Sequence, residues 1–232
     1  VERAPPTPHA TGLRLPAIPP EALQGEGGVT PGPGEYFRRV RQLCDQHNIL
    51  LILAVGRVGV GRTGKLWGYE HLGIEPDVFP VAKGLGGGIP IGAMLCKASC
   101  DVLRPGDHAS TFGGNPFACG VALAVCQIVE TENLIANAAA RGQQLRQGLH
   151  QLVNIYPHLF EQVRGWGLIN GLVLKTDAPL KSIDIVKAAM PQGLLLVPAG
   201  PSVVRFVPPL TVGVTDIDEA LEKLSMAVRS LS

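Results

Sequence analysis

The sequence predicts a layered α/β fold, and three observations carry that prediction. A helical pattern begins at Tyr36, where apolar side chains recur at helical spacing until Asn48. An uninterrupted apolar run from Ile49 to Val55 follows, as in parallel strands that are buried on both faces. Hydrophobic residues make up 46% of the 232 positions, which is enough for a large core. A helix that leads directly into a buried strand is typical of layered α/β proteins.

The remaining elements follow in chain order. Residues 1–20 are rich in proline and predict an irregular tail. After Val55, a glycine-rich turn leads to strands, separated by a glycine loop, at Asp77–Ala82 and Ile91–Cys96. A helical stretch then runs from Phe117 to about Val153, split near Glu132 to Leu134. Three strands and two helices complete the chain: strands Gly171–Lys175, Leu194–Val197 and Val203–Val207, and helices Ser182–Ala189 and Thr215–Leu231. Thr215 fits an N-cap, with Asp218 three positions later.

Composition and charge exclude several classes of protein. The formal net charge is +1, without the basic excess that drives binding to nucleic acid. No apolar run reaches the roughly 18 residues that cross a bilayer, and residues 1–20 lack the apolar block of a signal peptide. The five cysteines are odd in number and show no zinc-ligand spacing. We therefore expect a soluble, cytoplasmic protein with no membrane partner, no metal site, and reduced cysteines that mostly fill the core.

A first glycine-rich segment, Gly59–Gly64, matches the dinucleotide pattern GxGxxG after a buried strand. A dinucleotide loop opens a long helix, whereas the following LWGYEHLGIEP has no apolar stripe of adequate length. The same segment nearly spells a phosphate-binding P-loop, but Leu66 stands where a hydroxyl would bind Mg²⁺. A glycine-rich surface turn is therefore favoured over either nucleotide site.

Two other loops hold residues that could carry chemistry. Lys83 follows a predicted strand beside GLGGG, and a partly buried lysine there would be neutral often enough to attack an aldehyde. Taken alone, a solvated lysine in a flexible loop is the favoured interpretation. The segment Ser110–Pro116 (STFGGNP) places hydroxyls and amides just before a helix. That arrangement suits either an anion site or an ordinary helix-capping turn.

Taken in order, five motifs resemble the class III pyridoxal-phosphate aminotransferases: LQGEGGV, GVGRTGKLWGYE, AKGLGGGIPIGA, STFGGNP and RFVPPL. The resemblance implies the fold type I of these transferases. Residues 21–135 would form part of a large domain with a mixed, mostly parallel sheet, and residues 136–232 an α+β small domain, after the tail 1–20. Family members have an additional N-terminal half that nothing here resembles, so the resemblance implies an N-terminally truncated chain.

The resemblance also implies an activity. The amino group of N-acetylornithine, or a close ω-amino substrate, would pass to 2-oxoglutarate in arginine biosynthesis. Lys83 would hold pyridoxal 5′-phosphate as a Schiff base and then shuttle a proton. Thr111 would bind the cofactor phosphate of a neighbouring subunit, with Ser110 beside the substrate, which makes a homodimer necessary. Arg205 would take the substrate α-carboxylate as a planar fork, and Glu26 would pair with Arg205 in its absence. A structural ion pair between domains is the alternative for these last two residues.

Two positions depart from the family pattern. Where the family strand ends in Asp-Glu-Val-Gln, this chain has Ala54-Val55-Gly56-Arg57. The family aspartate keeps the pyridine nitrogen of the cofactor protonated, and Ala54 offers no charge for that task. Arg57 replaces a glutamine expected near the cofactor's phenolic oxygen. A catalytically impaired remnant, or a non-catalytic partner subunit, is therefore the alternative function.

Overall fold

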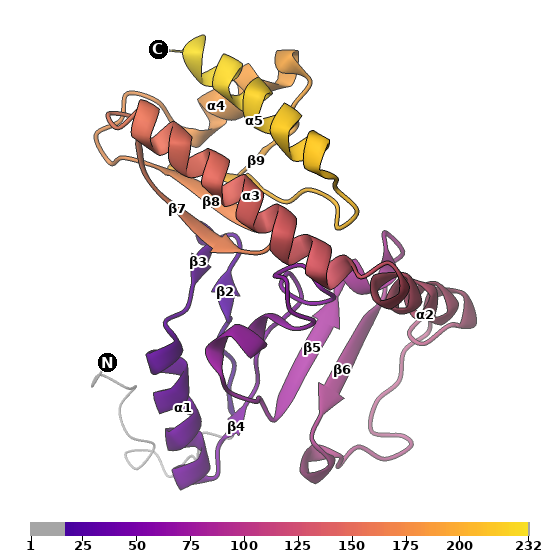
Figure 1. The fold of residues 1–232 in the computed structure, drawn as a ribbon. Coiled ribbons are helices and arrows are strands. Elements are labelled where there is room, and N and C mark those ends of the chain that lie inside the picture. Colours follow the sequence, from indigo (N-terminus) through magenta and orange to yellow (C-terminus); the bar gives the residue numbers. More distant parts are fainter. Residues whose placement is uncertain (1–16, 232) are drawn as a thin grey trace.

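The computed structural model describes residues 17–231 and divides them into fifteen α-helices and β-strands (Figure 1). In chain order these are β1 (Ala17–Ile18), β2 (Leu23–Gln24), β3 (Thr30–Pro31), α1 (Gly34–His47), β4 (Leu50–Leu51), β5 (Val78–Ala82), β6 (Gly92–Cys96), α2 (Pro116–Thr131), α3 (Leu134–Ile155), β7 (Phe160–Trp166), β8 (Ile169–Leu174), α4 (Ser182–Ala189), β9 (Val197–Pro198), β10 (Val203–Phe206) and α5 (Val214–Arg229). Short 3₁₀ helices occupy Gly68–Leu72, Lys83–Gly86, Ala98–Cys100 and Met190–Gln192.

Residues 134–231 form a closed layer structure. Their four strands pair antiparallel in the order β7-β8-β10-β9. α3 and α4 pack on this sheet, and α5 packs against α3 and α4 (Figure 1). Every residue of β8, the second strand in this order, is buried. Leucines from α3 meet β8 and α5 in one core that includes Leu145, Leu149, Leu172 and Leu224. The core of this region is thus closed, although Ile155, Met190 and Leu195 remain exposed on its surface.

Residues 17–131 form a more open arrangement. β1 pairs parallel with β4, and single parallel bridges extend this pairing from Ile52 to Val78 and from Glu21 to Ala54. β5 then pairs antiparallel with β6. The result is a mixed sheet, whose parallel part carries the apolar run after α1.

Burial in that run alternates, because Leu51, Leu53 and Val55 are buried while Ile52 and Ala54 are only half-buried. The expectation that Ile49–Val55 is buried on both faces is therefore wrong. Only one side of this strand faces the core formed with α1, which includes Phe37 and Cys44. The other side reaches the pockets described below.

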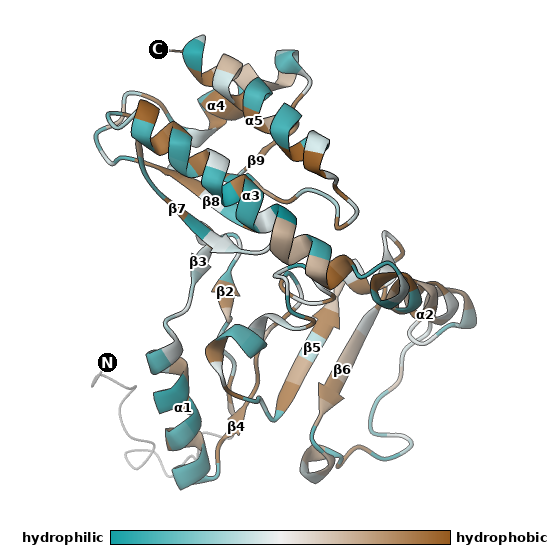
Figure 2. Cartoon of the chain, viewed as in Figure 1, coloured by the Kyte–Doolittle hydropathy of each residue, from teal (hydrophilic) through white to brown (hydrophobic). Residues whose placement is uncertain are grey.

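Apolar surface remains uncovered along β6 and α2. All five residues of β6 are exposed, although Figure 2 shows both β5 and β6 as largely hydrophobic. Phe117 at the start of α2 is 69% exposed. Among residues 17–231 no single helix is long and apolar enough to cross a membrane. Taken together, α2 and α3 have the length and composition of a membrane span, but the two helices are bent by 65° at the break between them.

A tight backbone junction joins the two regions. The turn between β7 and β8 contains Gly167, whose φ is +48°, and a Cβ there would lie 2.3 Å from the carbonyl carbon of Thr63. The Leu168 amide donates to the Arg62 carbonyl at 2.9 Å. The half-buried Arg62 guanidinium donates two hydrogen bonds, to the carbonyls of Leu168 and Pro208. Only glycine allows this approach, so the junction fixes one region against the other.

Most predicted elements are confirmed. α1 ends at Asn48, which adopts the left-handed conformation, and Asn133 does the same in the predicted break between α2 and α3. β5, β6, β8, β10 and α4 lie where they were expected. Residues 59–64 form turns that are followed by the short 3₁₀ helix Gly68–Leu72 and not by a long α-helix.

Four expectations about local structure are wrong. β7 was not predicted, and the strand expected at Leu194–Val197 is reduced to β9. The N-cap of α5 is Gly213, whose amide donates to Asp216 Oδ2 at 2.8 Å, and not Thr215 with Asp218. Within the expected irregular tail, residues 17–18 form β1; residues 1–16 lie outside the described part.

The cysteines also differ from expectation. All five are free thiols, but only Cys44 is buried. Cys96, Cys119 and Cys126 are exposed on β6 and α2 and therefore do not fill the core.

Candidate active site

Lys83 lies at the end of β5, where the strand gives way to a short 3₁₀ helix. Its backbone is left-handed, with φ of +54°, and so is that of Val60 on the facing turn, at +53°. Gly87 follows in the same conformation and ends the 3₁₀ helix. The strand therefore turns sharply after Ala82, and the lysine enters a pocket between this turn and β10.

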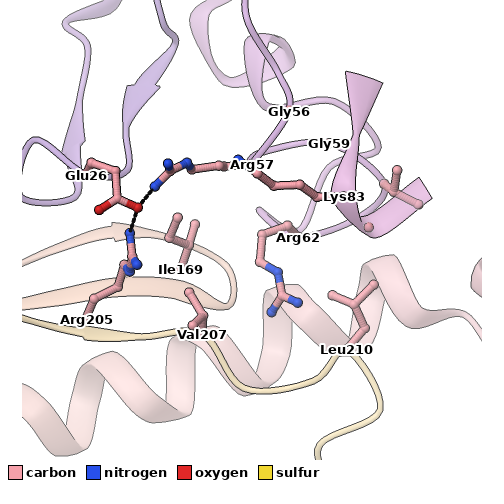
Figure 3. A pocket seen from close by; sticks show the side chains of 12 residues that line it. Glu26, Gly56, Arg57, Gly59, Arg62, Lys83, Ile169, Arg205, Val207 and Leu210 are labelled. Carbon is pink, nitrogen blue, oxygen red and sulfur yellow. Dashed lines mark hydrogen bonds and ion pairs between the residues drawn. The ribbon is translucent and has the colours of Figure 1, made fainter. Parts of the chain in front are cut away.

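Three charged side chains meet across this pocket. Glu26, from the turn between β2 and β3, accepts hydrogen bonds on one oxygen, Oε1, from both Arg57 and Arg205 (Figure 3). The Arg205 Nη1–Glu26 Oε1 distance is 3.0 Å, and the same nitrogen donates to the Gly25 carbonyl at 2.9 Å. The structure thus brings together four predicted site residues from distant segments, Lys83 included.

Arg205 is the most enclosed member of this group. Its side chain is 12% exposed, whereas that of Glu26 is 62% exposed. Within residues 17–231 the buried Arg205 Nε has no hydrogen-bond partner. A buried guanidinium with a free donor is suited to a planar, two-oxygen ligand such as a carboxylate.

The pocket has a volume of about 350 Å³, and Arg62, Ile169 and Leu210 also line it. The sequence motif that contains Arg62 suggested only a turn, so this residue was missed as part of the site. Burial lowers the pKa of Arg62 from its usual value, but its two carbonyl partners hold the charged group in place. Arg62 therefore joins the wall of the pocket to the junction at Gly167.

The pKa of the Lys83 amine is lowered from its ordinary value of 10.5. Partial burial is the largest cause, and the positive charges of Arg57 and Arg205 act in the same direction, while Glu21 opposes them. Lys83 is exposed overall, and it lines both pockets of the site. A lowered pKa increases the neutral fraction, the form that attacks a carbonyl carbon.

Ala54 lies in a second pocket of about 270 Å³ that shares Arg57 and Lys83 with the first. Glu21 lines it as well, because the bridge between Glu21 and Ala54 places both residues side by side. Sequence reasoning did not single out Glu21, although it precedes the LQGEGGV motif. Glu21 is the carboxylate that the described residues place in this second pocket.

Ser110 and Thr111 do not line either pocket with Lys83. Both are exposed, in a loop before α2, and Ser110 Oγ accepts from the Gly113 amide at 2.9 Å. Asn115 caps α2 by accepting from the Ala118 amide at 2.9 Å. The loop therefore includes the helix-capping turn that the sequence allowed.

Comparison with known proteins identifies the family of this chain. Residues 10–228 match the family described as Aminotransferase class-III. The chain belongs to this family. An acetylornithine aminotransferase from Nostoc sp. is 62% identical over 219 residues, which is 94% of this chain and 51% of that protein. The protein of the same name from Synechocystis sp. is 61% identical over 218 residues, again 94% and 51%. The chain spans about half the length of the curated relatives it matches.

Solved structures of class-III aminotransferases share the fold. The ornithine aminotransferase from Toxoplasma gondii superimposes with a TM-score of 0.86 at 35% identity, over 93% of this chain and 51% of that one. The N-acetylornithine aminotransferase from Stenotrophomonas maltophilia superimposes with a TM-score of 0.82 at 38% identity, over 93% of this chain and 56% of that one. The described residues are thus a part of the fold type I transferase, as expected.

Class-III aminotransferases use pyridoxal 5′-phosphate. The residues present fit this cofactor at its aldehyde, since Lys83 offers an amine of lowered pKa in a pocket rich in cations. At the position of the family aspartate, Ala54 provides no polar side chain. The carboxylate nearest in the fold to that position is Glu21, its bridge partner.

Proposed function

We propose that the protein moves an amino group from N-acetylornithine, or a close ω-amino substrate, to 2-oxoglutarate in arginine biosynthesis. The observation that carries the proposal is the meeting of Lys83, Arg205 and Glu26 in one pocket. Identities of 61–62% to proteins named acetylornithine aminotransferase support the choice of amino donor. Aminotransfer requires a lysine amine and a carboxylate-binding group at one site, and this pocket contains both.

Each residue has a role that its surroundings support. Lys83 would hold pyridoxal 5′-phosphate, which supplies an electron sink when bound. Its lowered pKa favours the neutral amine, the form of Lys83 Nζ that can accept a proton. Arg205 would bind the substrate carboxylate with its free donors, and Glu26 would neutralise Arg205 when that carboxylate is absent.

Several finer features belong to the same proposal. Thr111 would bind the cofactor phosphate of a neighbouring subunit, with Ser110 beside the substrate, in a homodimer. Their positions in an exposed loop, away from the pocket of Lys83, support a role outside this subunit's own pocket. The division into a large domain (21–135) and a small domain (136–232), and a cytoplasmic location, complete the proposal.

A labelling experiment tests the proposed role of Lys83. The purified chain is incubated with pyridoxal phosphate, reduced with borohydride and digested, so that the modified lysine is identified by mass spectrometry. We expect the label on Lys83, and its loss in Lys83→Ala. A matched control is Lys65→Ala, because Lys65 is a neighbouring exposed lysine outside both pockets. Absence of label at millimolar cofactor would contradict the proposed function.

A second candidate function is a catalytically impaired or non-catalytic partner subunit. Ala54 favours it, because the ring nitrogen loses a preorganised charge partner, which can cost on the order of 10² to 10³ in rate. Restoring the acid with Ala54→Asp tests this alternative through the rate of amino transfer. A large rise shows that the lost carboxylate limits the rate, whereas an unchanged rate excludes that explanation.

A further inference from the structure

The pocket of Lys83 has a surplus of positive charge. Of the described residues that line it, Arg57, Arg62, Arg205 and Lys83 are basic, and Glu26 is acidic. Arg62 is satisfied by two backbone carbonyls. Arg57 and Arg205 are left to share a single carboxylate, that of Glu26. Because two guanidinium groups share one carboxylate, one positive charge is not neutralised, and it can attract a second negative group.

The two arginines hold Glu26 in unequal ways. Both donate to the same oxygen, Oε1, so they compete for it (Figure 3). Arg205 has further donors, one of them on the Gly25 carbonyl and one without a partner among residues 17–231. Among the described residues, the polar partner of the Arg57 side chain is Glu26. Arg205 can therefore release Glu26 and bind another carboxylate, while Arg57 keeps its ion pair with Glu26.

We propose that Arg57 is a positioning residue for substrate binding: it retains Glu26 when Arg205 exchanges Glu26 for a substrate carboxylate. The inference rests on the proposed function, because it takes Arg205 as the residue that binds this carboxylate. With Arg57 present, two carboxylates face two guanidinium groups and each negative charge keeps a partner. Without Arg57, Glu26 and the substrate compete for Arg205 alone. The substrate class that benefits is a carboxylate.

Glutarate is a suitable probe, because it has two carboxylates and neither an amino nor a keto group, so it binds without reacting. Its dissociation constant is measured by titration calorimetry on the full 232-residue chain at fixed ionic strength. Arg57→Gln is expected to weaken binding by about three- to fivefold, the size of a partly exposed ion pair. Arg39→Gln removes the same charge from the exposed face of α1 and should leave binding unchanged.

The Glu26→Gln background separates retention of Glu26 from a general effect of positive charge. Removing Glu26 leaves nothing for Arg57 to retain, so the effect of Arg57→Gln on glutarate binding should shrink to less than about twofold. Arg57→Lys keeps the charge without the fork and should lie between the wild type and Arg57→Gln. Circular dichroism checks that each variant is folded. If Arg57→Gln does not fold, Arg57→Lys replaces it in the comparison with the wild type.

Three results would overturn the inference: no glutarate binding by the wild-type chain, equal or tighter binding by Arg57→Gln, or an undiminished effect of Arg57→Gln in the Glu26→Gln background. None of these measurements needs cofactor or amino transfer. Failure of the Lys83 labelling would therefore contradict the proposed function, whereas the glutarate measurements alone decide whether Arg57 retains Glu26.

Discussion

The two regions of this chain differ in how completely they bury their apolar residues. In residues 134–231, one four-stranded sheet packs under three helices, and β8 is buried along its whole length. In residues 17–131 the strands form two-stranded pairs joined by single bridges, and β6 is exposed along its whole length. The closed region contributes Arg205 to the pocket, and the open region contributes Glu26, Arg57 and Lys83.

Lys83, the lysine proposed to hold the cofactor, therefore belongs to the region that covers less of its own apolar surface. Along β6, α2 and the loop between them, the large apolar side chains that remain exposed are Met94, Leu95, Val102, Leu103, Phe112, Phe117, Leu123 and Ile128. We expect these side chains to form a common apolar surface, and a large exposed apolar surface marks an interaction site. Because the chain spans about half the length of its relatives, further protein is available in those relatives to contact this surface.

The largest expected effect is on stability, and it is tested by truncating one leucine in each region to alanine. Leu172→Ala in β8 empties a fully buried position and should lower the free energy of unfolding by about 2–5 kcal/mol. Leu95→Ala in β6, where the side chain is 37% exposed, should cost less than about 1 kcal/mol. Urea denaturation followed by circular dichroism measures both. Equal losses would break the comparison between a closed and an open region.

A smaller effect is expected at the junction between the regions. Gly167→Ala adds a Cβ 2.3 Å from the carbonyl carbon of Thr63 at a left-handed backbone position, and should destabilise by about 1–3 kcal/mol. Gly120→Ala in α2 is the control, because nothing lies within 4 Å of the added Cβ. That change should stabilise by up to about 1 kcal/mol, since alanine favours the helix. Thermal unfolding that ranks the two variants in the opposite order would contradict a rigid junction.

The smallest effect concerns pH. His71 from the open region stacks on Trp166 of β7, with ring centroids 4.5 Å apart. Burial, the largest cause, lowers the pKa of His71 from 6.5; Lys65 and Arg146 also lower it, while the bond to the Thr63 carbonyl and Glu70 oppose the shift. The unfolded chain then binds more protons, so stability should fall as pH drops below about 6.5.

The control for this titration is His71→Gln, which removes the ionisable group from the stack. The unfolding free energy of this variant should depend less on pH between 7 and 5 than that of the wild type. An unchanged pH dependence would show that other groups determine it.

Local sequence patterns were sufficient for elements whose apolar residues repeat regularly. α4 occupies Ser182–Ala189 as predicted, and the left-handed Asn133 breaks the long helical stretch where polar residues interrupt it. β7 was missed because it is an edge strand with mixed burial, so its residues show no clean alternation. The exposed cysteines were misjudged because composition does not show which apolar surfaces remain uncovered.

The site was predicted only through the ordered motifs and their resemblance to a family. Glu26 and Arg205 are 179 positions apart, and no local pattern indicates that they meet. The same holds for Arg62, whose guanidinium reaches Pro208 across 146 positions, and for Glu21 beside Ala54. The contacts of Arg205 with Glu26 and of Arg62 with Pro208 depend on packing between the two regions, and the Glu21–Ala54 bridge depends on strand pairing within the open region. Neither spacing nor periodicity encodes such contacts.

The left-handed backbone of Lys83 and Val60 has an evolutionary consequence. A side chain in this conformation costs on the order of 1–2 kcal/mol relative to glycine, and for a β-branched valine the conformation is a marked outlier. Selection for stability alone would therefore favour glycine at both positions. The lysine at position 83 marks a trade-off in which the chain gives up stability to keep an amine at the pocket.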